Sequence, residues 1–297
     1  MRTPVQSLRR IGRRGRTGRR VTRSLGGDTG VLLLLVLVGA FMGLPFVYAI
    51  MQSLKPMEEL FIFPPRFFVR SPTIENFYLL TQYAGNTWVP FSRYLFNSLF
   101  VTVTATAGQV LLCSMGAYVL AKGRIRGRKT VFAIVVTTLL FAYDVTAIPN
   151  YVIMSGLRLV NTYGALVVPA IAVPLGLFLM KQFIESSVPD ALLESARVDG
   201  APPLRIWWSV VMPMVKPAWL TLIIFSFQSI WGREGLEYIY NEALKVLPTM
   251  FRQISAGGIS RAGIAAASAV VLMVPPIITF ILSQSRVVET MAHSGIK

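Results

Sequence analysis

The chain has 297 residues, of which 54% are hydrophobic and only 14% charged, and its formal net charge is +16. With a mean hydropathy of +0.60, it is too apolar for an ordinary soluble domain. A single cysteine and a single histidine exclude a disulfide framework, a zinc site built from these residues and most catalytic triads. The composition therefore predicts an all-α, polytopic membrane protein with no catalytic or metal-binding residues.

The first 30 residues are strongly basic, with nine arginines between Met1 and Arg23. No aromatic side chains alternate with these arginines, as they do in many proteins that bind single-stranded nucleic acid, so we expect no nucleic-acid partner. No small-residue cleavage pattern follows the arginines either. We interpret the segment as a cytoplasmic tail that attracts anionic membrane lipid.

Six apolar stretches have about the 20 residues that a helix needs to cross a bilayer. They cover residues 31–53, 94–121, 131–155, 164–183, 216–239 and 264–284. The first helix and a long external loop, rich in proline and aromatic residues, occupy 31–93, and the core of the fold occupies 94–285. Prolines predict kinks in the fourth and sixth helices, at Pro169, Pro174, Pro275 and Pro276.

The basic residues fall on one side of this six-helix arrangement. Besides the N-terminal segment, five lie between Lys122 and Lys129, four between Lys181 and Lys216, and two in the tail 286–297. Cytoplasmic loops are enriched in Lys and Arg, so this pattern places both termini in the cytoplasm.

A polar segment at about 187–213 interrupts the apolar runs. Pro189 and Asp190 favour the start of a short helix, and Asp199-Gly200 favours its end, since glycine accepts a positive φ. A second short helix is expected from Leu204 to Met212, with Pro213 breaking the chain after it. The result is a helix-turn-helix elbow on the cytoplasmic side.

The spacing of this elbow resembles the EAA signature of the membrane subunits of ABC importers, which reads E-A-A, three residues, G, nine residues and I-x-L-P. Glu194, Ala196, Gly200 and Pro213 stand as the pattern requires, while Ser195, Val210 and Met212 are mild changes. In that family the elbow is the coupling helix, which sits in a cleft of the ATPase subunit. The resemblance implies that the ATPase-coupling residues are Glu194, Ala196, Arg197, Asp199, Gly200 and Pro213.

Further segments are similar to the carbohydrate-uptake branch of type I ABC permeases, and most of all to the maltose and glycerol-phosphate importers. They are Thr73-Ile74-Glu75-Asn76-Phe77, Asn97-Ser98, Ile148-Pro149 and Leu159-Val160-Asn161-Thr162-Tyr163. This resemblance implies a second permease subunit, two copies of an ABC ATPase, an extracytoplasmic solute-binding protein and a sugar substrate, in a bacterial plasma membrane. It also implies that Ser294, Gly295 and Lys297 form a short tail that reaches the ATPase.

No phosphate-binding loop is present in the sequence. The nearest candidate, 123–130, has the wrong gap and follows no strand. We therefore expect no cofactor on this chain, with ATP bound by the partner subunit.

Four polar or aromatic residues in the apolar stretches are candidates for the solute path: Asp144, Asn150, Gln228 and Trp231. Buried polar groups in a bilayer often mark a transport path, but they also join helices to one another. The alternatives to sugar import are an ABC permease for another solute and an ion-coupled secondary transporter. The latter normally needs several intramembrane carboxylates or an inverted repeat, and the sequence shows neither.

Overall fold

The computed structural model describes the backbone of residues 25–86 and 88–294, with side chains described except at 25, 26, 28, 143, 144 and 284–294. The expected basic tail falls almost wholly outside these residues. The chain divides into two units, 1–48 and 49–297, and each is considered by itself. The first contains most of α1 (Leu25–Ser53), an apolar helix at the place of the first predicted span.

The segment predicted as one long external loop contains two helices. They are α2 (Met57–Leu60) and α3 (Glu75–Gly85). Asn76 is buried at the start of α3, and its amide donates to the carbonyl oxygens of Ser53 and Lys55 at 2.9 and 2.8 Å. This side chain satisfies carbonyls where α1 ends, and so fixes α3 against that end.

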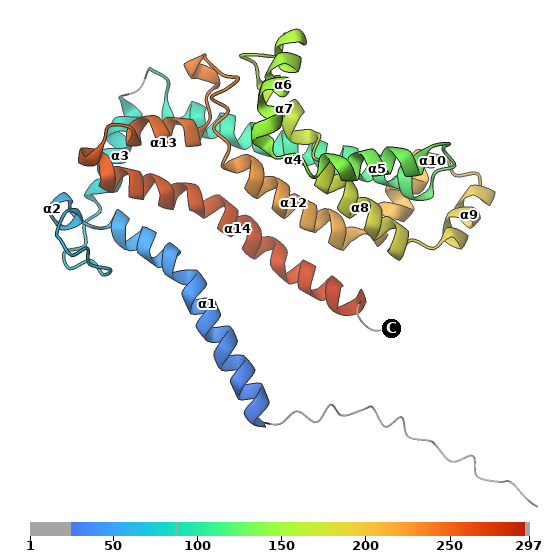
Figure 1. The fold of residues 1–297 in the computed structure, drawn as a ribbon, viewed down its shortest axis with the longest axis horizontal. Coiled ribbons are helices and arrows are strands. Elements are labelled where there is room, and N and C mark those ends of the chain that lie inside the picture. Colours follow the sequence, from blue (N-terminus) through green and yellow to red (C-terminus); the bar gives the residue numbers. More distant parts are fainter. Residues whose placement is uncertain (1–24, 87, 295–297) are drawn as a thin grey trace, which may run out of the picture. The chain divides into compact units, whose positions relative to one another are not determined.

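The second unit is built around α4 (Phe91–Lys122), which has the most buried residues of any helix among the side chains that the structure describes. It packs against α7 (Tyr163–Ile171), α8 (Pro174–Ser187) and α12 (Lys216–Trp231), as Figure 1 shows. Small residues allow this close approach. A Cβ atom on Gly108 would lie 2.7 Å from Ile171, and one on Gly116 would lie 2.9 Å from Leu177. Such small-residue contacts are the usual way in which helices pack in lipid.

The third predicted span, 131–155, is not one helix. It is divided into α5 (Arg128–Thr138) and α6 (Tyr143–Gly156). The hydroxyls of Thr137 and Thr138 donate to the carbonyls of Ala133 and Val135, at 2.9 and 2.6 Å, just before the interruption. Such hydroxyl bonds compete with the helical ladder and bend helices, which explains why the apolar run does not stay continuous.

The prolines act differently in the fourth and sixth predicted spans. Pro174 begins α8 after a break at Ala172 and Val173, so the predicted kink in the fourth span is present. Pro275 and Pro276 lie inside the long helix α14 (Ala262–Ser294), and Thr279 donates to the carbonyl of Pro275 at 2.9 Å. The carbonyls that lose their helical N–H partners are those of residues 271 and 272, and the carbonyl of Leu272 instead accepts the indole N–H of Trp231 at 3.0 Å.

The fifth predicted span is shorter than expected. α12 ends at Trp231, and residues 232–239 form a turn in which Gly235 has a φ of +64°. Beyond it lie a 3₁₀ turn at Glu242–Leu244, the amphipathic helix α13 (Leu247–Ser255) and a second 3₁₀ turn at Ile259–Arg261. The helix stops at Gly232, where the polar residues Arg233 and Glu234 follow, and Gly235 then supplies the positive φ of the turn beyond it.

Within the described residues, four helices are long and apolar enough to cross a membrane, counting α7 and α8 as one span. A fifth is added if α12 is joined to the bent segment before it. The all-α, polytopic class is thus confirmed. The predicted six membrane-spanning helices included α5 and α6 as one helix. Neither α5 nor α6 is long and apolar enough to be counted as a membrane-spanning helix.

Candidate functional site

The polar segment folds as the predicted elbow. Its first helix, α9 (Asp190–Val198), ends where Gly200 takes a φ of +77°. The amide of Gly200 donates to the carbonyl of Arg197, and the amide of Ala201 to that of Ala196, at 3.0 and 3.1 Å. This pair of bonds is a Schellman motif, which caps a helix and requires the positive φ that glycine accepts.

The second helix of the elbow is longer than expected and contains a π-helical turn. It comprises α10 (Pro203–Ile206), a π segment at Trp207–Val211 and α11 (Met212–Met214). Pro213 was predicted to break the chain, and it lies inside this helix instead. The amide of Met212 donates to the carbonyl of Trp207, five residues back, and this wider turn gives the proline ring room. The break comes at Val215, where the chain bends by 84° into α12.

Apolar side chains anchor the elbow to the membrane core. Leu193, Ile206, Val211 and Val215 are each at most 2% exposed and pack in one cluster with α4 and α8. The indole N–H of Trp219 on α12 donates to the carbonyl of Met212 at 3.1 Å, across the bend. The elbow is therefore a packed part of the helical core and not a loose loop.

Most of the predicted coupling residues are accessible on α9 and in the turn after it, while Pro213 lies on the second helix of the elbow. Glu194, Arg197, Asp199, Gly200 and Pro213 are exposed. Ala196 is half-buried, at the edge of the apolar cluster. The elbow thus presents a small, charged and accessible surface on a rigidly packed helix.

A charged hollow of about 400 Å³ lies beside α9. Its charged lining residues are Lys122, Arg124, Arg128, Glu185, Asp190, Glu194 and Arg197. The ammonium of Lys122, at the end of α4, bonds to the carboxylate of Asp190 at 2.8 Å. This hydrogen bond, with the nearby positive charges, holds the pKa of the Asp190 carboxyl below its usual value. The Lys122–Asp190 ion pair joins the end of α4 to the start of α9, and the sequence predicts that both lie on the same side of the membrane.

The candidates for the solute path differ in their exposure. Trp231 is 3% exposed, stacks on Phe227, and donates its indole N–H to the carbonyl of Leu272 at 3.0 Å. Gln228 is exposed on α12, and Asn150 is half-buried on α6. Asp144 lies in α6, but its side chain is outside the described residues, as are Ser294, Gly295 and Lys297 of the expected tail.

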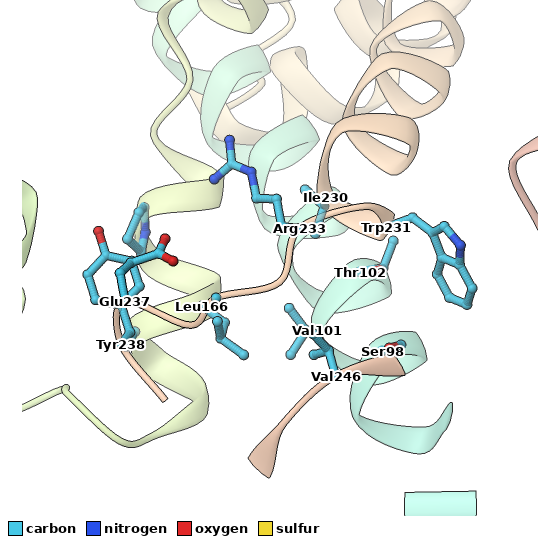
Figure 2. A pocket seen from close by; sticks show the side chains of 13 residues that line it. Ser98, Val101, Thr102, Leu166, Ile230, Trp231, Arg233, Glu237, Tyr238 and Val246 are labelled. Carbon is cyan, nitrogen blue, oxygen red and sulfur yellow. The ribbon is translucent and has the colours of Figure 1, made fainter. Parts of the chain in front are cut away.

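Trp231 also borders a small cavity of about 30 Å³, which has room for roughly one water molecule. In Figure 2, Ser98 and Thr102 approach it from α4, while Arg233 and Glu237 belong to the turn after α12. The nearby Asn97 is fully buried, donates to the carbonyls of Ala243 and Lys245, and accepts a bond from the hydroxyl of Tyr163 at 2.7 Å. These bonds fix the loop after α12 onto α4.

Sequence reasoning missed a layer of buried polar side chains between α4 and α12. Thr106, Gln109 and Ser226 are 6%, 3% and 1% exposed. In each, a side-chain oxygen has no hydrogen-bond partner among the described residues. The available signal was the spacing of Thr106 and Gln109, which are three residues apart and so share one face of α4.

Comparison with known proteins identifies the family. Residues 34–290 match the model of the "Binding-protein-dependent transport system inner membrane component". Protein LplC of Bacillus subtilis (strain 168) is 33% identical over 235 residues, covering 77% of this chain and 75% of that protein.

Further relatives are similar over most of their length. The arabinooligosaccharides transport system permease protein AraQ of Halalkalibacterium halodurans is 26% identical, over 85% of this chain and 90% of that protein. A solved bacterial ABC transporter, involved in import of the acidic polysaccharide alginate, has the same fold, with a TM-score of 0.72. Its sequence identity is 22%, over 89% of this chain and 98% of the solved chain. The chain therefore belongs to the family of inner membrane components of binding-protein-dependent transport systems.

Proposed function

We propose that this chain is a permease subunit of an ABC importer that carries a sugar or oligosaccharide across the plasma membrane. The observation that carries the proposal is the elbow: a charged, accessible helix fixed to the membrane core by a buried apolar face. The names of the relatives support the substrate class. They include transport systems for arabinooligosaccharides, sulfoquinovosyl glycerol and sn-glycerol-3-phosphate.

In this proposal the ATPase subunit binds to the elbow. Glu194 and Arg197 supply charges for docking, Ala196 allows close approach, and Asp199 and Gly200 form the turn that sets the angle of α9. Pro213 belongs to the helix that leads back into the membrane. ATP is bound and hydrolysed by two copies of a partner ATPase, and this chain holds no cofactor of its own.

The remaining assignments complete the assembly. A second permease subunit shares the membrane path, and an extracytoplasmic binding protein delivers the sugar. Both termini are cytoplasmic, with a basic tail at 1–30 and a C-terminal tail at 286–297 that reaches the ATPase through Ser294, Gly295 and Lys297. The solute path includes Gln228, which is exposed on α12, together with Asp144, Asn150 and Trp231.

The test is uptake by the full complex in proteoliposomes, with its own binding protein and ATP inside. The solutes are arabinose oligosaccharides, sulfoquinovosyl glycerol and sn-glycerol 3-phosphate, with amino acids for comparison. We expect uptake of a carbohydrate that requires ATP. If an amino acid enters while every carbohydrate is inert, the substrate assignment fails and the chain serves another solute.

A further inference from the structure

The segment between α1 and α3 exposes a run of apolar side chains. Phe61, Ile62 and Phe63 are 50%, 39% and 92% exposed, and Phe68 is 68% exposed. Single apolar side chains on a protein surface are common, whereas several close together mark a contact with another molecule or with a membrane. Residues 61–68 are called the apolar tip below.

Buried charged side chains hold the apolar tip in place. The ammonium of Lys55, which is 1% exposed, donates to the carbonyl of Arg66 at 2.5 Å. The carboxylate of Glu59, which is 7% exposed, accepts the backbone N–H groups of Arg70 and Ser71 at 2.9 and 3.4 Å. These bonds connect the residues before the tip to residues within and after it. The exposed apolar side chains are therefore carried by a fixed framework and not by a free loop.

The apolar tip lies beside the ends of two membrane-spanning segments. One of these segments ends at Ser53 and the other begins at Ile259. The short helix α2, directly before the tip, packs against α14 (Figure 1). A Cβ atom on Gly263, in the first turn of α14, would lie 2.2 Å from the side chain of Asn76, which bonds to the end of α1. The framework thus keeps the tip at the level where membrane-spanning helices meet the lipid headgroups.

The chemistry of the apolar tip favours lipid over a protein partner. Phenylalanine lacks the polar group of tryptophan and tyrosine, so its ring fits below the headgroups, at the boundary with the acyl chains. Pro64 and Pro65 have no backbone N–H, and so the tip has two fewer donors that would lose water on insertion. A protein interface normally surrounds its apolar centre with hydrogen-bonding groups, and here such donors are missing from the tip itself.

Basic residues at the tip match the phosphate groups of phospholipids. Arg66 is half-buried and Arg70 is exposed, and a long arginine side chain reaches a phosphate while its stem lies along apolar surface. Residues 55–71 include three basic and two acidic side chains, which leaves one net positive charge. This charge favours anionic lipid over zwitterionic lipid.

We propose that the apolar tip is a membrane anchor, which inserts into the leaflet where α1 ends and α14 begins. Phe61, Phe63 and Phe68 lie among the outer parts of the acyl chains, and Arg66 and Arg70 bind phospholipid phosphates. The anchor fixes the depth of two span ends in the bilayer. It depends neither on the identity of the solute nor on the ATPase.

Fluorescence quenching tests the insertion. Phe63→Cys is made in a Cys113→Ala background, labelled with a bimane fluorophore and assembled into the full complex in nanodiscs of phosphatidylcholine and phosphatidylglycerol. The control is Asn86→Cys, at an exposed polar position after α3, and the complex without an introduced cysteine gives the background. One quencher is a phospholipid with a doxyl group near the top of its acyl chain, and the other is aqueous iodide.

We expect the doxyl lipid to quench the Phe63→Cys probe about threefold more strongly than the control probe, and iodide to show the reverse order. Both positions are exposed, so neither change disturbs a packed side chain. Equal quenching of the two probes would overturn the proposal. Protection of the Phe63→Cys probe from iodide only after the sugar-loaded binding protein is added would overturn it in favour of a protein partner.

Lipid selectivity tests the arginine contacts. Quenching of the Phe63→Cys probe by doxyl-phosphatidylglycerol is compared with quenching by doxyl-phosphatidylcholine at the same mole fraction. One net positive charge should enrich the anionic lipid about fivefold at the probe. Arg66→Gln combined with Arg70→Gln should reduce this ratio to one or below, whereas Arg158→Gln, at an exposed position after α6, should leave it unchanged. A ratio of one in the parent, or an equal ratio in the double variant, would refute the phosphate contacts.

Discussion

Gly200 shows how one residue controls the shape of the elbow. Its φ of +77° allows the two capping bonds that end α9. A β-branched residue at this φ is strained by about 2 kcal/mol or more, so Gly200→Val should change the angle of α9 and abolish ATP-driven uptake. Gly200→Asn is the control, because asparagine tolerates this conformation. Normal uptake by the valine variant, at wild-type levels in the membrane, would show that the turn is dispensable.

The Lys122–Asp190 pair ties α9 to the end of α4. Lys122 is only 9% exposed, whereas Asp190 is 76% exposed. Asp190→Asn should lower the uptake rate partially, because it removes the charge that holds the Lys122 ammonium. The exchange of both charges, Lys122→Asp with Asp190→Lys, should restore part of the loss. A double variant no better than the single one would argue against the tether.

The same pair predicts a pH dependence. The pKa of the Asp190 carboxyl is lowered in the folded protein, chiefly by its hydrogen bond to Lys122. The ionised carboxylate therefore stabilises the fold at pH values above the ordinary carboxyl pKa, and this stabilisation is lost as the pH falls through the lowered pKa. The ratio of the wild-type uptake rate to that of Asp190→Asn should therefore stay constant from about pH 8 to about pH 5. A ratio that falls to one within this range would contradict the assignment.

Asn97 has a structural role that the sequence resemblance alone does not explain. It makes three hydrogen bonds, to Ala243, Lys245 and Tyr163, in a fully buried position. Asn97→Ala leaves these groups without partners and should lower the free energy of unfolding by about 2–4 kcal/mol. Thermal unfolding in detergent measures this, with the exposed Asn86→Ala as the control. A shift no larger than that of the control would contradict the proposed role.

At the scale of elements, the π-helical turn sets the rotation of the second elbow helix. It adds one residue to what would otherwise be an α-helical turn. Deleting the exposed Ser209 should restore an α-helical turn and rotate α10 by about 100° relative to α12. We expect membrane insertion to persist and uptake to be lost, whereas Ser209→Ala should retain uptake. Full uptake by the deletion variant would show that the rotation of α10 relative to α12 does not matter for transport.

The sequence predicted those elements whose ends carry a local chemical signal. The Gly200 turn and the break before Pro174 follow from residues with restricted or unusual backbone preferences. The interruption of 131–155 was missed, because two threonine hydroxyl bonds replace any proline or glycine signal there. The elbow was predictable because its signal is local in the sequence, whereas the buried polar residues of the core were not. The spacing of Glu194, Gly200 and Pro213 lies within one segment, while the buried polar residues Thr106, Gln109 and Ser226 come from α4 and α12, which are far apart in the chain.

For the whole molecule, the account requires energy from another chain. The purified subunit alone should show no saturable ATP binding at micromolar concentration, because the sequence lacks a phosphate-binding loop. Equilibrium binding of a labelled nucleotide measures this, with the assembled complex as the positive control. Saturable ATP binding by the isolated subunit would contradict the assignment of ATP binding to a partner chain.

We propose that the charged face of α9 couples ATP hydrolysis to transport. The most direct measurement is ATP-driven uptake by the reconstituted complex carrying Glu194→Lys, compared with Glu75→Lys, which reverses an exposed charge on α3. Reversal of a docking charge is expected to weaken association with the ATPase strongly. We expect Glu194→Lys to abolish uptake while the subunit remains in the membrane, and Glu75→Lys to retain the wild-type rate. Wild-type uptake by Glu194→Lys would contradict it.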